Sequence, residues 1–227
     1  VSFFRVTQFG KENYKQFVVF CRRQTYNMSR LTRRREPFQF MVWLGIGGSV
    51  LLFTVLLGVY IVRQSSPGWA DVALPNVFVM STLVILLSSL TLHNAKQAFG
   101  RENFSGFRIN IATTLVLGTL FILLQGWGWR QMIRSGVGLE GNPAGGFIYI
   151  ISGLHLLHIL IGLVFIAITL AEALRRRAYV EAFVYSVNPP NQLKIRLITL
   201  YWHFVDILWI VLFVFLLIHH RVDWRLY

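Results

Sequence analysis

Five long apolar stretches, separated by short polar segments, dominate the hydrophobic pattern of this chain. A helix needs about 20 consecutive apolar residues to cross a hydrocarbon core of about 30 Å, and each stretch is about that long. The pattern therefore predicts an all-α integral membrane bundle of five transmembrane helices. The stretches cover residues 38–62, 72–95, 109–129, 147–171 and 197–220.

Turn-forming residues separate these stretches. SSPGW at 65–69 and EGNPAGG at 140–146 are rich in Gly, Pro and Ser, and NPPN at 188–191 stops any helix from running through. We therefore expect three parts along the chain. They are a basic cytoplasmic N-terminal segment (1–37), the five-helix transmembrane domain (38–220) and a short external tail (221–227).

The distribution of Lys and Arg predicts the direction of the helices. The N-terminal segment and every second connection hold 17 of these residues, whereas the alternate connections and the tail hold 5. Positively charged segments stay on the cytoplasmic side of a membrane. The N-terminus is therefore expected inside and the C-terminus outside, as an odd number of spans requires.

Composition agrees with a membrane protein and argues against a nucleic-acid partner. Of the 227 residues, 55% are hydrophobic and 14% are charged, against about 25% charged in soluble domains. The net charge of +13 is concentrated between the apolar stretches and is not spread over a soluble face. The only cysteine, Cys21, can form no internal disulfide and has no nearby metal-ligand set.

The N-terminal segment is too polar to span the membrane and has two open interpretations. Its basic residues could tether it to anionic lipid, at about 1 kcal/mol each. It could instead be a contact arm for a partner subunit.

Polar residues inside the last two apolar stretches are the candidate functional residues. His203 and Asp206 lie three residues apart, and so do His155 and His158. Residues three apart lie close together on a helix surface, and a carboxyl group in mid-membrane costs about 2.5–3.5 kcal/mol on insertion scales. Gly162 beside this histidine pair lets another helix approach closely.

We expect these polar residues to fix how the last two spans dock. The hypothesis is that His155 or His158 hydrogen-bonds to His203 or Asp206. A haem or copper site is less favoured, because two ligands at this spacing need a third group from elsewhere. A proton relay through His and Asp is a further alternative. The sequence shows no phosphate-binding loop, nucleophile elbow or carboxylate cluster, so we predict no catalytic, cofactor-binding or metal-binding residues.

Two motifs in order resemble subunit III of the haem–copper respiratory oxidases, the cytochrome c oxidase subunit III family. They are SGLHLLHILIGLVF at 152–165 and YWHFVDILW at 201–209, and the similarity extends back through LGTLFILLQGWGW at 117–129 and TLHNA at 91–95. The residues that fall on the family's signature positions are His155, His158, Trp202, His203 and Asp206.

The resemblance implies an accessory subunit with no redox centre of its own. Such a subunit packs beside subunit I, which holds the haems and copper of a complex that reduces oxygen to water and pumps protons. It stabilises that complex, supports proton uptake and binds phospholipid in a V-shaped cleft between its helices. The resemblance also implies other oxidase subunits as partners. The expected location is the bacterial cytoplasmic membrane, ahead of the mitochondrial inner membrane.

Two departures from the family pattern matter. The chain resembles the short five-helix forms, without the first helix pair of the seven-helix forms. Many members carry a glutamate in the helix that matches span 1, whereas this chain has Ser49 there. For phospholipid we predict contacts at the basic residues flanking span 1, namely Arg33, Arg34, Arg35 and Arg63.

Alternatives remain open at this point. The chain could be a subunit III-like component of a quinol oxidase or a nitric oxide reductase, because the electron-donor site lies on other subunits. It could also be a haem-binding membrane anchor. A stand-alone proton-coupled transporter is less favoured, because the spans are continuous and show no internal repeat.

Overall fold

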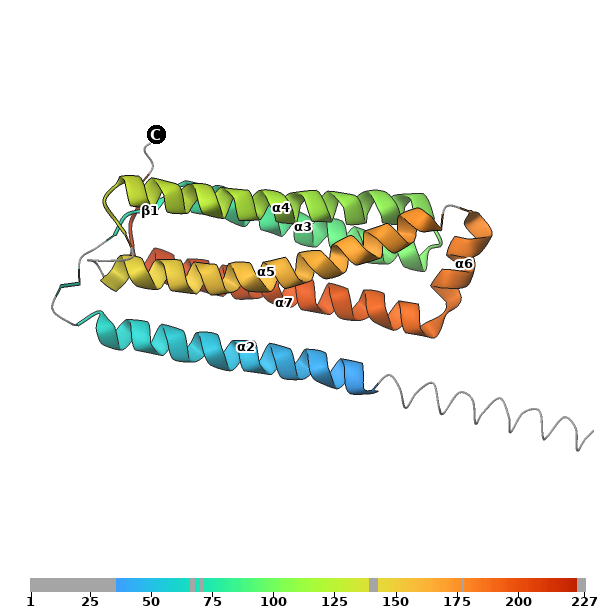
Figure 1. Cartoon of the computed structure of the whole chain (residues 1–227), viewed down its shortest axis with the longest axis horizontal. Helices are drawn as coiled ribbons and strands as arrows, with labels where there is room; N and C mark the ends of the chain where they lie inside the picture. The colour runs from blue at the N-terminus through green and yellow to red at the C-terminus, as the bar shows by residue number, and fades with distance from the viewer. Residues whose placement is uncertain (1–35, 66–67, 70–71, 139–142, 177, 224–227) are drawn as a thin grey trace, which may run out of the picture. The chain divides into compact units, whose positions relative to one another are not determined.

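The computed structural model of the chain describes residues 36–65, 68–69, 72–138, 143–176 and 178–223. Five of its helices are long and apolar enough to cross a membrane, which confirms the all-α membrane fold (Figure 1). Residues 1–35 and 224–227, which include most of the predicted N-terminal segment and tail, lie outside the described residues. The five helices are α2 (Glu36–Arg63), α3 (Val77–Gly100), α4 (Phe104–Arg134), α5 (Pro143–Arg175) and α7 (Pro189–His219).

The described residues also contain a short helix, α6 (Tyr179–Val187), and two short strands, β1 (Leu74–Pro75) and β2 (Val222–Asp223). The sequence predicts a loop where α6 lies. As predicted, the NPPN segment ends one helix and begins another, because Pro189 occupies the first turn of α7, where its missing N–H costs nothing.

The turn between α3 and α4 is three residues long and has an unusual backbone conformation. Asn103 caps α4, since its Oδ1 accepts a hydrogen bond from the Gly106 N–H at 3.0 Å. Glu102 has φ +59°, the left-handed region that non-glycine residues rarely adopt. The tight turn places α3 and α4 side by side.

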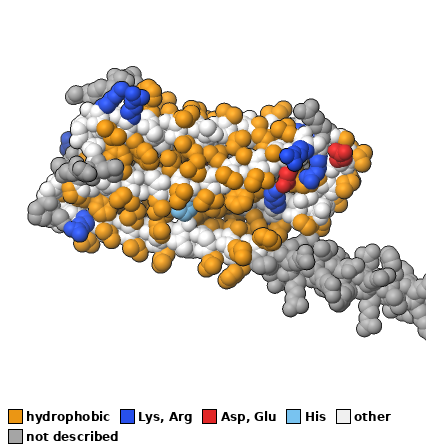
Figure 2. Space-filling view, in the orientation of Figure 1, with side chains coloured by type: hydrophobic (Ala, Val, Ile, Leu, Met, Phe, Trp, Pro, Cys, Tyr) orange, Lys and Arg blue, Asp and Glu red, His pale blue; other side chains and the backbone are white. Residues whose placement is uncertain are grey.

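The described residues from 45 to 223 form one compact unit, and its main core is shared by α3, α4, α5 and α7. In it, α3 packs against α4 and α7, and α5 packs against α4 and α7. Large side chains such as Phe121, Trp202 and Trp209 fill the interior. Figure 2 shows hydrophobic side chains over the middle of the visible face and Lys and Arg side chains near its two ends, as a membrane protein requires.

At the end of the bundle opposite α6, the chain is held by contacts between distant segments. β1 pairs in parallel with β2, with Leu74 opposite Val222. The Tyr60 hydroxyl of α2 lies 2.8 Å from His220 Nε2, after the end of α7. These contacts join the end of α2 and the segment before α3 to the end of the last span.

Candidate functional site

The polar residues that the sequence singles out all lie near the middle of their helices. His155 and His158 belong to α5, and His203 and Asp206 belong to α7. At 1.5 Å per residue, each lies at least about 18 Å from either end of its helix. Because half of a hydrocarbon core is about 15 Å, these side chains belong to the centre of the membrane.

Trp202 is the residue around which three other helices meet α7. Its side chain is buried, and its indole Nε1 donates a hydrogen bond to Ser88 Oγ of α3 at 3.1 Å. A Cβ atom added to Gly118 of α4 or Gly162 of α5 would come within 2.9 Å of the Trp202 ring. The two glycines therefore make room for the indole, as the sequence predicts for Gly162.

Trp209 makes the same kind of contact two turns further along α7. Its Nε1 donates to Thr82 Oγ1 of α3 at 2.9 Å. The hydroxyl groups of Ser88 and Thr82 in turn donate to backbone carbonyls of their own helix, those of Ile85 and Phe78. Each buried indole N–H and each hydroxyl hydrogen is thus satisfied, which a water-free interior requires.

His155 is fully buried between aromatic rings. Its ring centroid lies 4.9 Å from that of Trp209 and 5.9 Å from that of Phe121, which it meets edge-on. Among the described residues, neither of its ring nitrogens has a hydrogen-bond partner. His155 therefore acts here as an aromatic packing residue.

His158 points to a different neighbour, α2. Its Nδ1–H donates to the carbonyl of Leu154 at 2.8 Å, and its Nε2 lies 2.9 Å from Ser49 Oγ. The Ser49 hydroxyl also lies 2.8 Å from the carbonyl of Gly45. Ser49 thus forms a polar link between α2 and α5.

His203 pairs with α3. Its Nδ1 lies 2.7 Å from Ser89 Oγ, and both side chains are half-buried. The ring of His93, which is exposed, lies 6.4 Å from the ring of His203, and His93 Nε2 is 2.9 Å from Gln97 Nε2. We refer to Ser89, His93, Gln97 and His203 as the α3/α7 seam.

Asp206 is buried one turn from His203. Its exposed fraction is 2%, and neither carboxyl oxygen makes a well-formed hydrogen bond among the described residues, although the Ser89 hydroxyl of α3 lies close enough to interact with the carboxyl group. An ionised carboxylate without a donor is very costly in a low-dielectric interior. The surroundings therefore suit an uncharged side chain at this position.

The predicted hydrogen bond from His155 or His158 to His203 or Asp206 is wrong. His158 bonds to Ser49, His203 bonds to Ser89, and the other two side chains have no such partner among the described residues. Positions three residues apart differ by about 60° around a helix. That angle is enough to turn His155 into the core and His158 towards α2.

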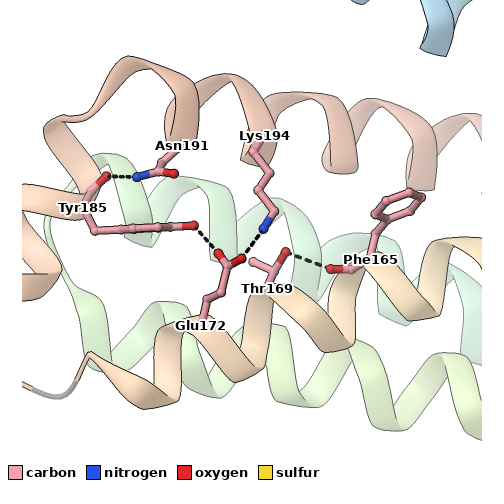
Figure 3. Close-up of polar contacts among 6 residues, drawn as sticks. All are labelled: Phe165, Thr169, Glu172, Tyr185, Asn191 and Lys194. Atoms are coloured by element: carbon pink, nitrogen blue, oxygen red, sulfur yellow. Dashed lines mark hydrogen bonds and ion pairs between the residues drawn. The ribbon is translucent and has the colours of Figure 1, made fainter. Parts of the chain in front are cut away.

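A charged cluster at the α6 end of the bundle was not anticipated from the sequence. Figure 3 shows Glu172 of α5 between Tyr185 of α6 and Lys194 of α7. Lys194 Nζ lies 2.7 Å from Glu172 Oε1, and the Tyr185 hydroxyl donates to Glu172 Oε2 at 2.8 Å. Burial, together with the hydrogen bond to Glu172, raises the pKa of Tyr185 to about 12. The cluster ties three consecutive helices together.

The chain is similar to known proteins over most of its length. The family model described as cytochrome c oxidase subunit III matches residues 41–221. The chain belongs to the cytochrome c oxidase subunit III family. The match covers all five long helices, so the bundle described above is the fold of a subunit III of the haem–copper oxidases.

Individual members of the cytochrome c oxidase subunit III family are similar over most of the chain. A probable cytochrome c oxidase subunit 3 of Mycobacterium leprae is 29% identical, over 76% of this chain and 82% of that protein. The cytochrome c oxidase subunit 3 of Alkalihalophilus pseudofirmus is 30% identical, over 75% and 81%. The quinol oxidase subunit 3 of Bacillus subtilis is 26% identical, over 75% and 81%.

The remaining predicted positions in this subunit III chain lie only in part within the described residues. In the described part of the chain, no group of three or more His, Cys, Asp or Glu side chains could hold a metal ion. Arg63, predicted to contact lipid, is exposed in the last turn of α2. Arg33, Arg34 and Arg35 lie outside the described residues.

Proposed function

We propose that this chain is an accessory, non-redox subunit that packs against the catalytic subunit I of a terminal oxidase in the bacterial cytoplasmic membrane. In this role it stabilises subunit I and supports its proton uptake, while haem, copper and oxygen chemistry belong to the partner. Both cytochrome c oxidase and quinol oxidase subunits are among its relatives. The proposed role is therefore the same whether cytochrome c or a quinol is the electron donor.

The α3/α7 seam is the observation that carries the proposal. Ser89 lies about 16–18 Å from both ends of α3, so the seam begins at mid-membrane depth. There Ser89 and His203 are half-buried, and His93, one turn further along α3, is exposed. Polar side chains at this depth are costly against lipid and face protein or water.

A second polar pair at this depth, Ser49 and His158, is also half-buried. The α3/α7 seam extends further, because His93 and Gln97 continue it along α3 towards the α6 end of the bundle. Its groups can donate and accept hydrogen bonds across helices, which stabilises helix association in membranes by roughly 0.6–2 kcal/mol per contact. The seam therefore suits a transmembrane helix of a partner subunit.

Purification from native membranes tests the proposal. The tagged chain is extracted in mild detergent, the proteins that accompany it are identified, and a reduced-minus-oxidised spectrum is recorded. We expect a large haem-bearing subunit with oxidase activity, and a colourless subunit III chain after dissociation in harsher detergent.

Two other results would contradict the proposal. A chain that comes out alone and colourless favours the stand-alone transporter. A haem spectrum from the isolated chain makes His155, His158 and His203 candidate ligands and favours the haem-binding anchor.

A further inference from the structure

A cavity of about 440 Å³ opens at the α6 end of the bundle, between α3, α6 and α7. Two cationic side chains line it, Lys96 of α3 and Arg196 of α7, together with the carboxylate of Glu102. The rest of its wall includes the apolar side chains of Phe99, Val187 and Ile195 and the polar side chains of Ser186 and Gln192. The cavity thus combines separate positive and negative groups with a partly hydrophobic wall.

The two cations are available for a ligand. Lys96 and Arg196 are exposed, and neither forms an ion pair with another described residue. Lys194, only two residues before Arg196, is instead paired with Glu172. A phosphate group is the natural counter-ion for a Lys and an Arg that share one cavity.

The carboxylate of Glu102 indicates that the ligand also carries a cationic group. Glu102 lies in the left-handed backbone region, φ +59°, where Gly or Asn is usual. Strained backbone conformations of this kind cluster at functional sites. Glu102 Oε2 accepts only a long hydrogen bond, 3.4 Å, from the Tyr179 hydroxyl. The carboxylate can therefore bind a cationic group of the same ligand.

The depth of the cavity matches the headgroup region of a bilayer. Lys96 and Arg196 each lie seven residues, about 10 Å, along their helices from the mid-membrane pair Ser89 and His203. Lys and Arg side chains extend several ångströms further towards the membrane surface. Their charged ends therefore reach the edge of the hydrocarbon core, about 15 Å from its centre.

We propose that this cavity binds the headgroup of an aminophospholipid, with the phosphate at Lys96 and Arg196 and the ammonium group at Glu102. The site is distinct from the lipid contacts predicted at the basic residues around span 1. The site requires only that the chain lies in a membrane. The lipid-binding experiment can therefore succeed or fail whether or not the chain docks to subunit I.

Photolabelling in native membranes or in the purified complex tests the site. The probes are phosphatidylethanolamine and phosphatidylglycerol, each with a photoreactive group near the glycerol, and the labelled peptides are identified by mass spectrometry. We expect phosphatidylethanolamine to label peptides from the end of α3 and from α6. Labelling should fall about tenfold in the K96Q/R196Q variant, since two solvent-exposed and therefore screened charge contacts are lost.

Two further variants make the result specific. Glu102→Gln should remove the preference for phosphatidylethanolamine over phosphatidylglycerol and leave the labelling by phosphatidylglycerol intact. R130Q/R134Q removes two exposed arginines at the opposite end of α4 and should change nothing.

Three results would overturn the assignment. The first is unchanged labelling in K96Q/R196Q. The second is equal labelling by the two lipids in the wild-type chain, which would remove the role of Glu102. The third is complete displacement of the lipid by excess inorganic phosphate, which would identify a site for a soluble anion.

Discussion

Polar side chains in this subunit III chain hold helices together mainly through small hydroxyl groups. Trp202 and Trp209 each donate to a hydroxyl of α3, and His158 and His203 each pair with a serine of another helix. A serine or threonine hydroxyl can accept a hydrogen bond while donating to a carbonyl of its own helix. Ser88 and Thr82 therefore satisfy the indole N–H groups of Trp202 and Trp209 without leaving their own hydroxyl hydrogens unpaired in the membrane.

Enlarging Gly162 should loosen the contact at Trp202. In Gly162→Ala the new Cβ lies 2.9 Å from the buried indole, and overpacking of this kind destabilises by about 1–3 kcal/mol. The measurement is the thermal unfolding midpoint of the purified complex. Gly126→Ala in α4 is the control, since nothing lies within 4 Å of its Cβ position. An unchanged midpoint in Gly162→Ala would contradict the close packing.

Replacing Asp206 by an uncharged side chain of the same shape should cost little stability. In Asp206→Asn the shape is kept, and the carboxyl group has no well-formed hydrogen bond among the described residues to lose. The nearby Ser89 hydroxyl can donate to the amide oxygen of Asn as it can to the carboxyl group. We expect the free energy of unfolding and the retention of the subunit to stay within about 0.5 kcal/mol of the wild type. A large loss of either would show that the ionised carboxylate has a partner, and would revive the proton-relay hypothesis.

At the scale of elements, the cluster around Glu172 fixes the short helix α6 between two membrane-spanning helices. The pair of Lys194 and Glu172 is about one-third exposed, with exposed side-chain fractions of 30% and 34%. Arg176 stacks on the other partner, with its guanidinium carbon 4.2 Å from the centre of the Tyr185 ring. Of the nine residues of α6, Ala182 and Ser186 are buried, so the cluster adds polar contacts to a small buried face.

A double-mutant cycle measures the ion pair. Replacing Glu172 and Lys194 by Gln, singly and together, should reveal a coupling free energy of about 0.5–1 kcal/mol, the usual range for a partly exposed pair. Glu181 is the control: it is an exposed carboxylate of α6, and its substitution should be additive with that of Lys194. Additivity in the Glu172 cycle as well would show that the pair contributes nothing to stability.

The pKa of Tyr185 gives this cluster a pH dependence. The folded chain keeps the phenol protonated up to pH about 12, whereas an unperturbed tyrosine ionises near 10.0. The stabilisation from this group is therefore complete below pH 10 and is lost as the pH rises through 12. Tyrosinate absorbance, compared between wild type and Tyr185→Phe, measures the pKa. Glu172→Gln should lower it, and an unchanged value would contradict the hydrogen bond to Glu172.

At the scale of the whole molecule, the hydrophobic pattern predicts most of the fold because hydrocarbon thickness determines helix length. The five spans are predicted in this way, and the break at NPPN is predicted from its prolines. The helix α6 is missed, because nine residues are too few to stand out in a pattern read for membrane spans.

The partners of the candidate residues could be predicted only in part. The motif residues stand out as polar groups in apolar stretches, but two residues three apart can face different helices, as His155 and His158 do. One signal could have found the α3 partners. That helix carries two neighbouring hydroxyl pairs about two turns apart, Ser81 with Thr82 and Ser88 with Ser89, as Trp202 and Trp209 are about two turns apart in α7. The actual indole partners, Thr82 and Ser88, are six residues apart. Only the packing of the helices shows which hydroxyl residue of α3 contacts which tryptophan of α7.

The most direct test of docking through the α3/α7 seam is to locate the partner subunit on the surface of the chain. A photo-cross-linking residue replaces Leu86, which lies on α3 one turn before Ser89, and in a control it replaces Leu123 on the outward side of α4. Docking through the α3/α7 seam should give an adduct with a haem-bearing partner subunit from position 86 and lipid adducts alone from position 123. Lipid adducts alone at position 86, or the same partner adduct at both positions, would contradict docking through the α3/α7 seam.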